Sequence, residues 1–172
     1  ASYDLSNSIN AQNVDTTGIN DIEDNIALWL DASAVHAGLT TPASNETIAS
    51  WIDLSGNGIH VIQTDSSGNP LFSNSGIQFD GSDDSLINLD ASVLSFSGTQ
   101  EYSFFVLFKP DQIHSGTLFS KFDTVVSGEY YLQANSSSKI VIHREVTPWN
   151  LSSVSDYVSN QITFSTMTYD GA

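Results

Sequence analysis

The chain contains no cysteine among its 172 residues, so neither a disulfide framework nor a thiolate metal site can form within it. Basic residues are almost as scarce, because four Lys and Arg face twenty Asp and Glu and give a formal net charge of −16. Nucleic acids and anionic lipids bind to basic patches, so this balance argues against both as partners. It favours divalent cations, a high-salt setting or solubility through repulsion between copies.

Long hydrophobic runs are also missing. No stretch stays apolar for the roughly 18 residues that a membrane-spanning helix needs, so we expect no membrane insertion. The chain has no Walker loop, no Gly-x-Ser-x-Gly elbow and no His-Glu-x-x-His, and its four histidines lie far apart. We therefore predict that this chain is not an enzyme by itself and that it binds no zinc.

What the sequence does contain is a series of short strand-like runs, separated by turns rich in Gly, Asn, Asp and Ser. The strongest is Tyr102–Phe108, which is aromatic or apolar almost throughout. Asp80–Asp84 has the composition of a hairpin connection between strands at 76–79 and 85–89. No segment shows an apolar period of 3.6, so the pattern predicts an all-β fold, an antiparallel β-sandwich. The other expected strands cover 26–30, 48–54, 59–64, 117–122, 129–133, 139–143 and 161–169.

Four motifs carry a resemblance to a known family. They are Leu28-Trp-Leu-Asp-Ala-Ser33, Trp51-Ile-Asp-Leu-Ser-Gly-Asn-Gly58, Gly76-Ile-Gln-Phe-Asp-Gly-Ser-Asp-Asp84 and Met167-Thr-Tyr-Asp-Gly171. With them the chain resembles the laminin-G-like, concanavalin-A-like lectin jelly-roll superfamily over residues 26–171. The resemblance implies an antiparallel β-sandwich of jelly-roll type over residues 23–172, after a polar linker or arm at residues 1–22.

The resemblance also bears on completeness and catalysis. In this family the Thr-Tyr-Asp-Gly element is normally followed by further strands, whereas this sequence ends at Ala172. We expect either a domain truncated at its C-terminus or a sheet that another chain completes by strand addition. Glycosidases of this fold usually carry two glutamates on one strand. The glutamates here are isolated along the sequence, which favours a non-catalytic role.

A calcium site is one hypothesis for the first glycine-rich turn. Asp53, Ser55 and Asn57 are spaced two apart and precede Gly58, so their side-chain oxygens can curl around a hard cation. An EF-hand is excluded, because Thr64 stands where the twelfth-position glutamate belongs. The alternative is that Asp53 and Asn57 cap their own turn through bonds from side chain to backbone.

Asp80, Asp83 and Asp84 form the densest carboxylate cluster of the chain. Three neighbouring carboxylates repel one another, and a bound calcium ion would relieve that repulsion. The alternative is a solvated turn that carries surplus charge. If the two turns lie at the same end of the sandwich, Asp53 and Asp80 share one ion.

Two aromatic residues are candidates for glycan contact. Trp149 follows Pro148 in the polar stretch Val146–Ser153, where we expect no strand, and an exposed indole can stack on the apolar face of a sugar ring. Tyr157 is a second candidate in the same part of the chain. The alternative is that Trp149 only plugs the end of the sandwich.

These observations predict a non-catalytic adhesion or carbohydrate-binding module, lectin-like, with a structural calcium. We expect it in an exported bacterial protein, secreted or extracellular at the cell surface, where its partner is a glycan or a cell-surface protein. Two alternatives stay open. One is a structural assembly module of a filament, fibre or adhesin spacer with protein–protein contacts only, and the other is an accessory domain of a larger hydrolase.

Overall fold

The computed structural model describes residues 25–73, 76–89, 92–96, 100–121, 130–144 and 150–171. These residues form antiparallel strands and short 3-10 turns, so the predicted all-β antiparallel class is confirmed. They belong to two compact units, one ending at Asn88 and the other beginning at Leu89, and each is described by itself. Within the described ranges, no helix has the length and apolar character to cross a membrane.

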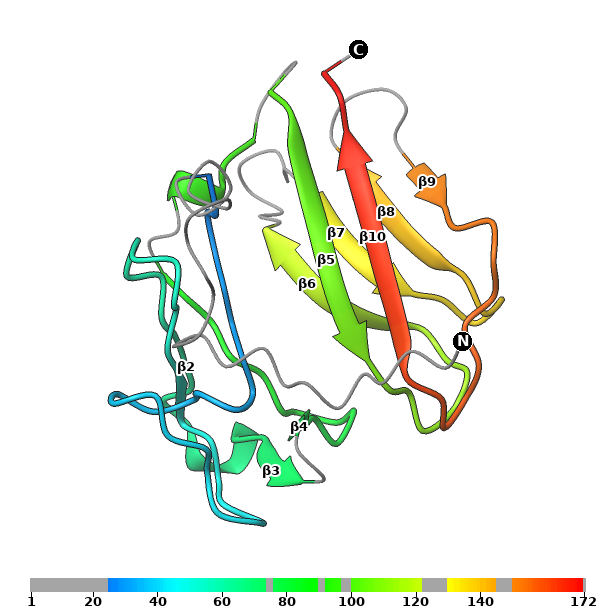
Figure 1. Ribbon diagram of the computed structural model, residues 1–172. Helices are drawn as coiled ribbons and strands as arrows, with labels where there is room; N and C mark the ends of the chain where they lie inside the picture. The colour runs from blue at the N-terminus through cyan, green and yellow to red at the C-terminus, as the bar shows by residue number, and fades with distance from the viewer. Residues whose placement is uncertain are drawn as a thin grey trace, which may run out of the picture. The chain divides into compact units, whose positions relative to one another are not determined.

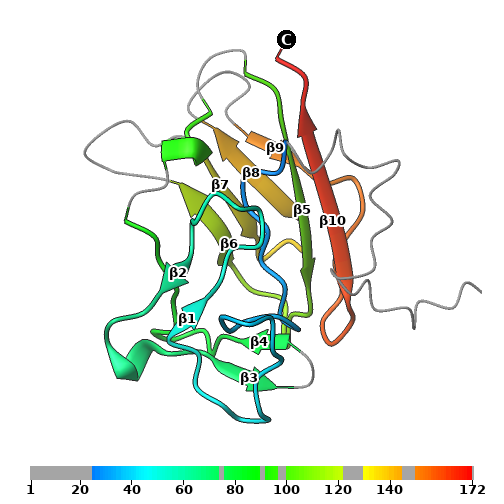
Figure 2. The same cartoon turned by 60° about the vertical axis from the view of Figure 1, so that its left-hand side comes forward.

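The first unit contains two short antiparallel pairs (Figure 2). Strand β1 (Ser50–Trp51) pairs with β2 (Val61–Ile62), and β3 (Leu71–Ser73) pairs with β4 (Gly76–Gln78). The short helix η2 (Ser66–Gly68) follows β2, and its N-terminus is capped by Asp65. A small core holds the unit together, formed by buried Val35, Ile48 and Phe72 with Trp51, Ile77 and Leu86 packed against them.

Two predictions for this unit are wrong. The apolar run 26–30 forms no strand, and its backbone is instead held by side chains of the glycine-rich turn. Asp80–Asp84 does not connect a hairpin, because β4 pairs with the preceding strand β3. The stretch after the turn bonds elsewhere, since Ile87 forms an isolated antiparallel bridge with Ile62.

The second unit contains two sheets (Figure 1). Strands β5 (Tyr102–Phe108) and β10 (Thr163–Tyr169) form an antiparallel pair over seven residues each. The other sheet has the order β6-β7-β8-β9, with a register shift between Thr117 and Phe119 in β6. Its strands are β6 (Gly116–Lys121), β7 (Tyr130–Ala134), β8 (Ile140–Arg144) and β9 (Asn150–Ser152), and the short helix η3 (Ser92–Leu94) precedes β5.

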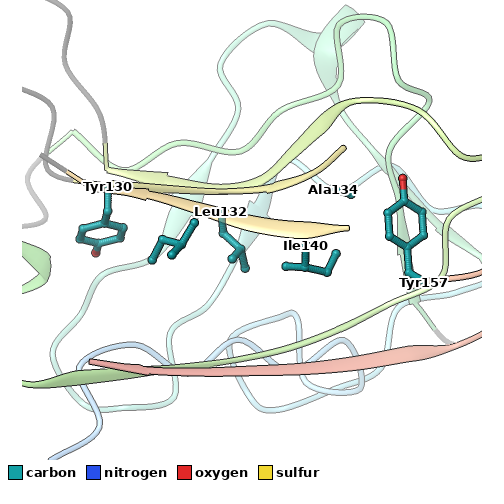
Figure 3. Packing of buried hydrophobic residues seen from close by; sticks show 6 residues of the cluster. Tyr130, Leu132, Ala134, Ile140 and Tyr157 are labelled. Carbon is teal, nitrogen blue, oxygen red and sulfur yellow. The ribbon is translucent and has the colours of Figure 1, made fainter. Parts of the chain in front are cut away.

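The core of the second unit lies between these two sheets. Figure 3 shows Tyr130, Leu132 and Ile140 pointing from β7 and β8 toward the β5–β10 layer. Leu132 and the neighbouring Ile142 are fully buried, and burial of such side chains stabilises by about 1.5–3 kcal/mol each. From the opposite sheet, alternate residues of the paired strands pack against them, namely Tyr102, Phe104, Val106, Phe108 and Met167.

Strand prediction succeeded best in this unit. The predicted run Tyr102–Phe108 matches β5, and four more predicted runs match β6, β7, β8 and β10 to within two residues. The prediction of no strand within Val146–Ser153 is wrong, because Asn150–Ser152 forms β9 and pairs with β8. A three-residue strand carries too short an alternation to be recognised from sequence.

Candidate functional site

Asp53 is the centre of the glycine-rich turn and is buried. Its Oδ1 accepts hydrogen bonds from the backbone N–H groups of Trp29 at 3.0 Å and Ser55 at 2.9 Å. Its Oδ2 accepts from the Ser55 hydroxyl at 2.8 Å and from the Ile59 N–H at 3.0 Å. Burial by itself raises the pKa of this carboxyl, but the hydrogen bonds together outweigh it and hold the pKa below the ordinary value.

Asn57 continues the same hydrogen-bonded loop. Its Nδ2 donates to the carbonyl oxygens of Ile26 and Ala27, both at 3.0 Å. The capping alternative describes Asp53, which accepts from the backbone of Ser55 and Ile59 in its own turn. The side chain of Asn57 instead holds the backbone of a segment about 30 residues earlier. A calcium ion held by Asp53, Ser55 and Asn57 would have to displace the four hydrogen bonds that Asp53 accepts.

Asp80, Asp83 and Asp84 do come together in space, with carboxylate oxygens within 4.8 Å of one another. The group is largely exposed. Asp84 Oδ2 accepts from the Asp80 N–H at 2.8 Å, and Asp80 Oδ1 accepts from the Ser82 N–H at 2.8 Å. The Ser82 bond, together with weaker ones, lowers the pKa of Asp80. Among the described residues this cluster does not include Asp53.

Tyr157 is not available for glycan contact. Its side chain is buried at 3% exposure within the core of the second unit, and its ring meets Phe108 edge-on. The hydroxyl has one proton to donate, which is shared between the carbonyl oxygens of His114 at 3.0 Å and Asn135 at 2.8 Å. No ring face is left for a sugar, so this prediction is wrong. Trp149 lies outside the described residues.

The outward face of the β5–β10 pair is apolar and exposed. Phe105 and Leu107 of β5 are each 69% exposed, and Phe164 of β10 is 64% exposed. Phe164 stands directly opposite Leu107 in the register, and Phe105 stands opposite Thr166. We call these four residues the outer apolar face. At one end of it the hydroxyls of Ser103 and Thr168 are hydrogen-bonded at 2.9 Å.

The sequence contains a signal for this face that the strand pattern alone does not reveal. In Tyr102–Phe108 the inward positions are apolar, and two of the three outward positions are apolar as well. The sequence pattern predicts only that this run is a strand, and such a nearly continuous composition is typical of a strand buried on both faces. The structure buries only one face.

A buried cation lies at the opposite side of this pair of strands. Arg144, at the end of β8, is 7% exposed, and its Cζ lies 3.5 Å from the ring centroid of Tyr169 and 5.7 Å from that of Tyr102. Its Nη1 is buried and has no hydrogen-bond partner in the part of the chain that the structure describes. Burial raises the pKa of the Tyr102 hydroxyl, although the nearby Arg144 charge opposes the shift.

The outward face of the four-stranded sheet carries a row of side chains at matching register. Ser120 pairs with Tyr131, Tyr131 with His143, and His143 with Asn150. The rings of Tyr131 and His143 are stacked, with centroids 4.1 Å apart and an interplanar angle of 17°. The row therefore combines an aromatic surface with hydroxyl and amide groups.

In comparisons with known proteins, no family model, curated protein or solved structure matches the chain.

Proposed function

We propose that this chain is a non-catalytic structural assembly module, in which the outer apolar face of β5 and β10 contacts the same face of a second copy. The observation that carries the proposal is the exposure of Phe105, Leu107 and Phe164 together on one sheet. Soluble monomers rarely leave contiguous large apolar side chains in water, and such patches are typical of contact surfaces.

Charge supports a second copy as the occupant. Two chains with a formal charge of −16 repel each other, so they can associate only where carboxylates are absent. Neither β5 nor β10 contains a charged residue. A two-fold contact also matches a surface with itself, so apolar positions meet apolar positions without a separately evolved partner.

The same charge predicts how association depends on salt. Screening reduces repulsion between the acidic surfaces, with a Debye length of about 10 Å at 0.1 M salt. Apolar contact is not weakened by screening. Association through the outer apolar face therefore becomes stronger as sodium chloride is added, whereas an interface built on ion pairs becomes weaker.

Light scattering after size exclusion tests the proposal. Wild type should show a dimer whose fraction grows with protein and salt concentration, and Phe105→Ser or Phe164→Ser should shift it to monomer. Val154→Ser is the matched control, because Val154 is 96% exposed but lies outside both strands. A monomer at every concentration and salt level, or equal loss of dimer in the control, contradicts the proposal. Dimer formation only with a different protein would identify another occupant.

A glycan-binding module is the second candidate function, and the stacked pair Tyr131–His143 favours it. Flat aromatic surfaces flanked by hydroxyl and amide groups suit the apolar face and the hydroxyls of a sugar. Tyr131→Ala should abolish retention on neutral glycans, while Tyr157→Phe should leave it unchanged, since Tyr157 is buried. Retention that survives Tyr131→Ala removes this candidate.

The proposal also includes the position of a structural calcium ion and the location of the protein. Any structural calcium belongs at Asp80, Asp83 and Asp84, because Asp53 is already saturated with hydrogen-bond donors. An extracellular setting on a bacterial surface agrees with the acidic, cysteine-free composition. A role as an accessory domain of a larger hydrolase is compatible with the same contact surface.

A further inference from the structure

The guanidinium of Arg144 lies over the ring of Tyr169. A distance of 3.5 Å from Cζ to the ring centroid leaves no room for a strong tilt, since a tilted group would drive a nitrogen into the ring. The interaction joins β8 of one sheet to β10 of the other. It also uses only the flat face of the guanidinium, so the five N–H donors, which point outward in its plane, are not consumed by the ring.

Within the described residues, one of those in-plane donors lacks the partner that a buried arginine normally has. Nη1 is buried without a hydrogen bond, and no carboxylate of the described residues forms an ion pair with Arg144. By contrast, Lys139 is paired with Asp156 at 2.8 Å. An unpaired buried charge is strongly destabilising, and a cation–π contact offsets only part of that cost.

We propose that Arg144 is an anion-binding site, in which the edge of the guanidinium held against Tyr169 binds the carboxylate of a small ligand. A carboxylate is the matching chemistry, because its two oxygens accept two parallel N–H bonds from the planar fork of an arginine. The ring of Tyr169 fixes the plane of that fork before the ligand arrives. Acidic sugars and simple organic acids share this group, and the experiment separates them.

The composition of the chain allows a direct measurement. Arg144 is the only arginine in the sequence, so its Nε–H signal in a nitrogen-15 NMR spectrum is assigned without mutagenesis. Sodium acetate and sodium glucuronate are titrated separately at constant ionic strength, with glucose as the uncharged control. The site predicts a saturable shift of this signal with at least one of the two anions and none with glucose. Tighter binding of glucuronate identifies an acidic sugar as the ligand, and equal binding identifies the carboxylate alone.

Stability provides the second measurement. A ligand at ten times its Kd raises the folding equilibrium constant of the wild type about elevenfold. In Arg144→Met, which replaces the cation with an apolar side chain of similar length, only the general salt effect remains. Arg144→Lys keeps the charge but lacks the fork, so its response is weaker than that of the wild type.

The proposal does not depend on the assembly of two copies, because the inner and outward faces of β5 and β10 are tested by different variants. An unchanged Nε–H signal with both anions overturns it. That result would mean that a carboxylate of this chain already pairs with Arg144, or that the buried site admits no ligand. An equal stability response in wild type and Arg144→Met overturns it as well.

Discussion

The carboxylate of Asp53 accepts a hydrogen bond from the backbone N–H of Trp29, which lies 24 residues earlier in the chain. Ser55 and Ile59 donate to the same carboxylate from within the turn. One side chain thus fixes both the glycine-rich turn and the apolar run 26–30, which forms no strand of its own. The residue types that suggested a cation site build a hydrogen-bonded loop instead.

Removing this carboxylate should destabilise the protein strongly. Asp53→Ala leaves the N–H groups of Trp29, Ser55 and Ile59 without their acceptor, and each buried unsatisfied donor costs about 1–3 kcal/mol. We expect a loss of about 3 kcal/mol in the free energy of unfolding, measured by urea titration. Asp83→Asn is the control, and an exposed substitution of this kind should stay within about 0.5 kcal/mol. Equal effects of the two variants would show that Asp53 has no special structural role.

The same carboxylate makes stability depend on pH. Its pKa in the folded protein lies below the ordinary value of 3.8, so the folded state binds this proton less readily than the unfolded state. The stabilisation is therefore complete above the ordinary value and is lost as pH falls through the folded pKa. Asp65 and Asp80 have lowered pKa values too, so the difference between wild type and Asp53→Asn isolates Asp53. That difference should shrink as the solution becomes more acidic, and a constant difference would contradict the account.

Tyr157→Phe should reveal a purely structural hydroxyl. The substitution keeps the ring in the core but removes the donor to the carbonyl oxygens of His114 and Asn135. We expect a loss of about 1–2 kcal/mol in thermal or urea unfolding, typical of a buried hydrogen bond whose acceptors stay behind. Unchanged stability would mean that these carbonyls find other donors at no cost.

Calcium has a test that separates the two turns. If an ion binds at Asp80, Asp83 and Asp84, added calcium raises the melting temperature of wild type, and a chelator reverses the rise. The double variant Asp83→Asn and Asp84→Asn should lose the response completely. Ser55→Ala should keep it, although its basal stability falls with the lost bond to Asp53. An identical melting temperature with calcium and with chelator would show that the folded protein binds no calcium ion at this cluster.

The strands of the second unit were predicted well, because long runs of aromatic and apolar residues such as Tyr102–Phe108 strongly favour a strand. Strand prediction from the sequence failed where tertiary contacts determine the local structure. The run 26–30 has strand composition, but Asp53 and Asn57 bind its backbone from far along the chain. The role of the predicted site residues was uncertain for a similar reason. Side-chain oxygens that bind calcium also cap turns, and their spacing in the sequence does not separate a calcium site from a capped turn. The stack of Arg144 on Tyr169 joins different strands and left no local signal at all.

The assembly of two copies through β5 and β10 is tested most directly by a single cysteine at position 166. The chain has no cysteine of its own, and Thr166 is exposed opposite Phe105 within the outer apolar face. Under mild oxidation, Thr166→Cys should form a disulfide-linked dimer much faster than Ser137→Cys, which places the thiol in an exposed turn of the same unit. Equal rates of cross-linking at the two positions, or no cross-linked dimer from Thr166→Cys, would contradict the account.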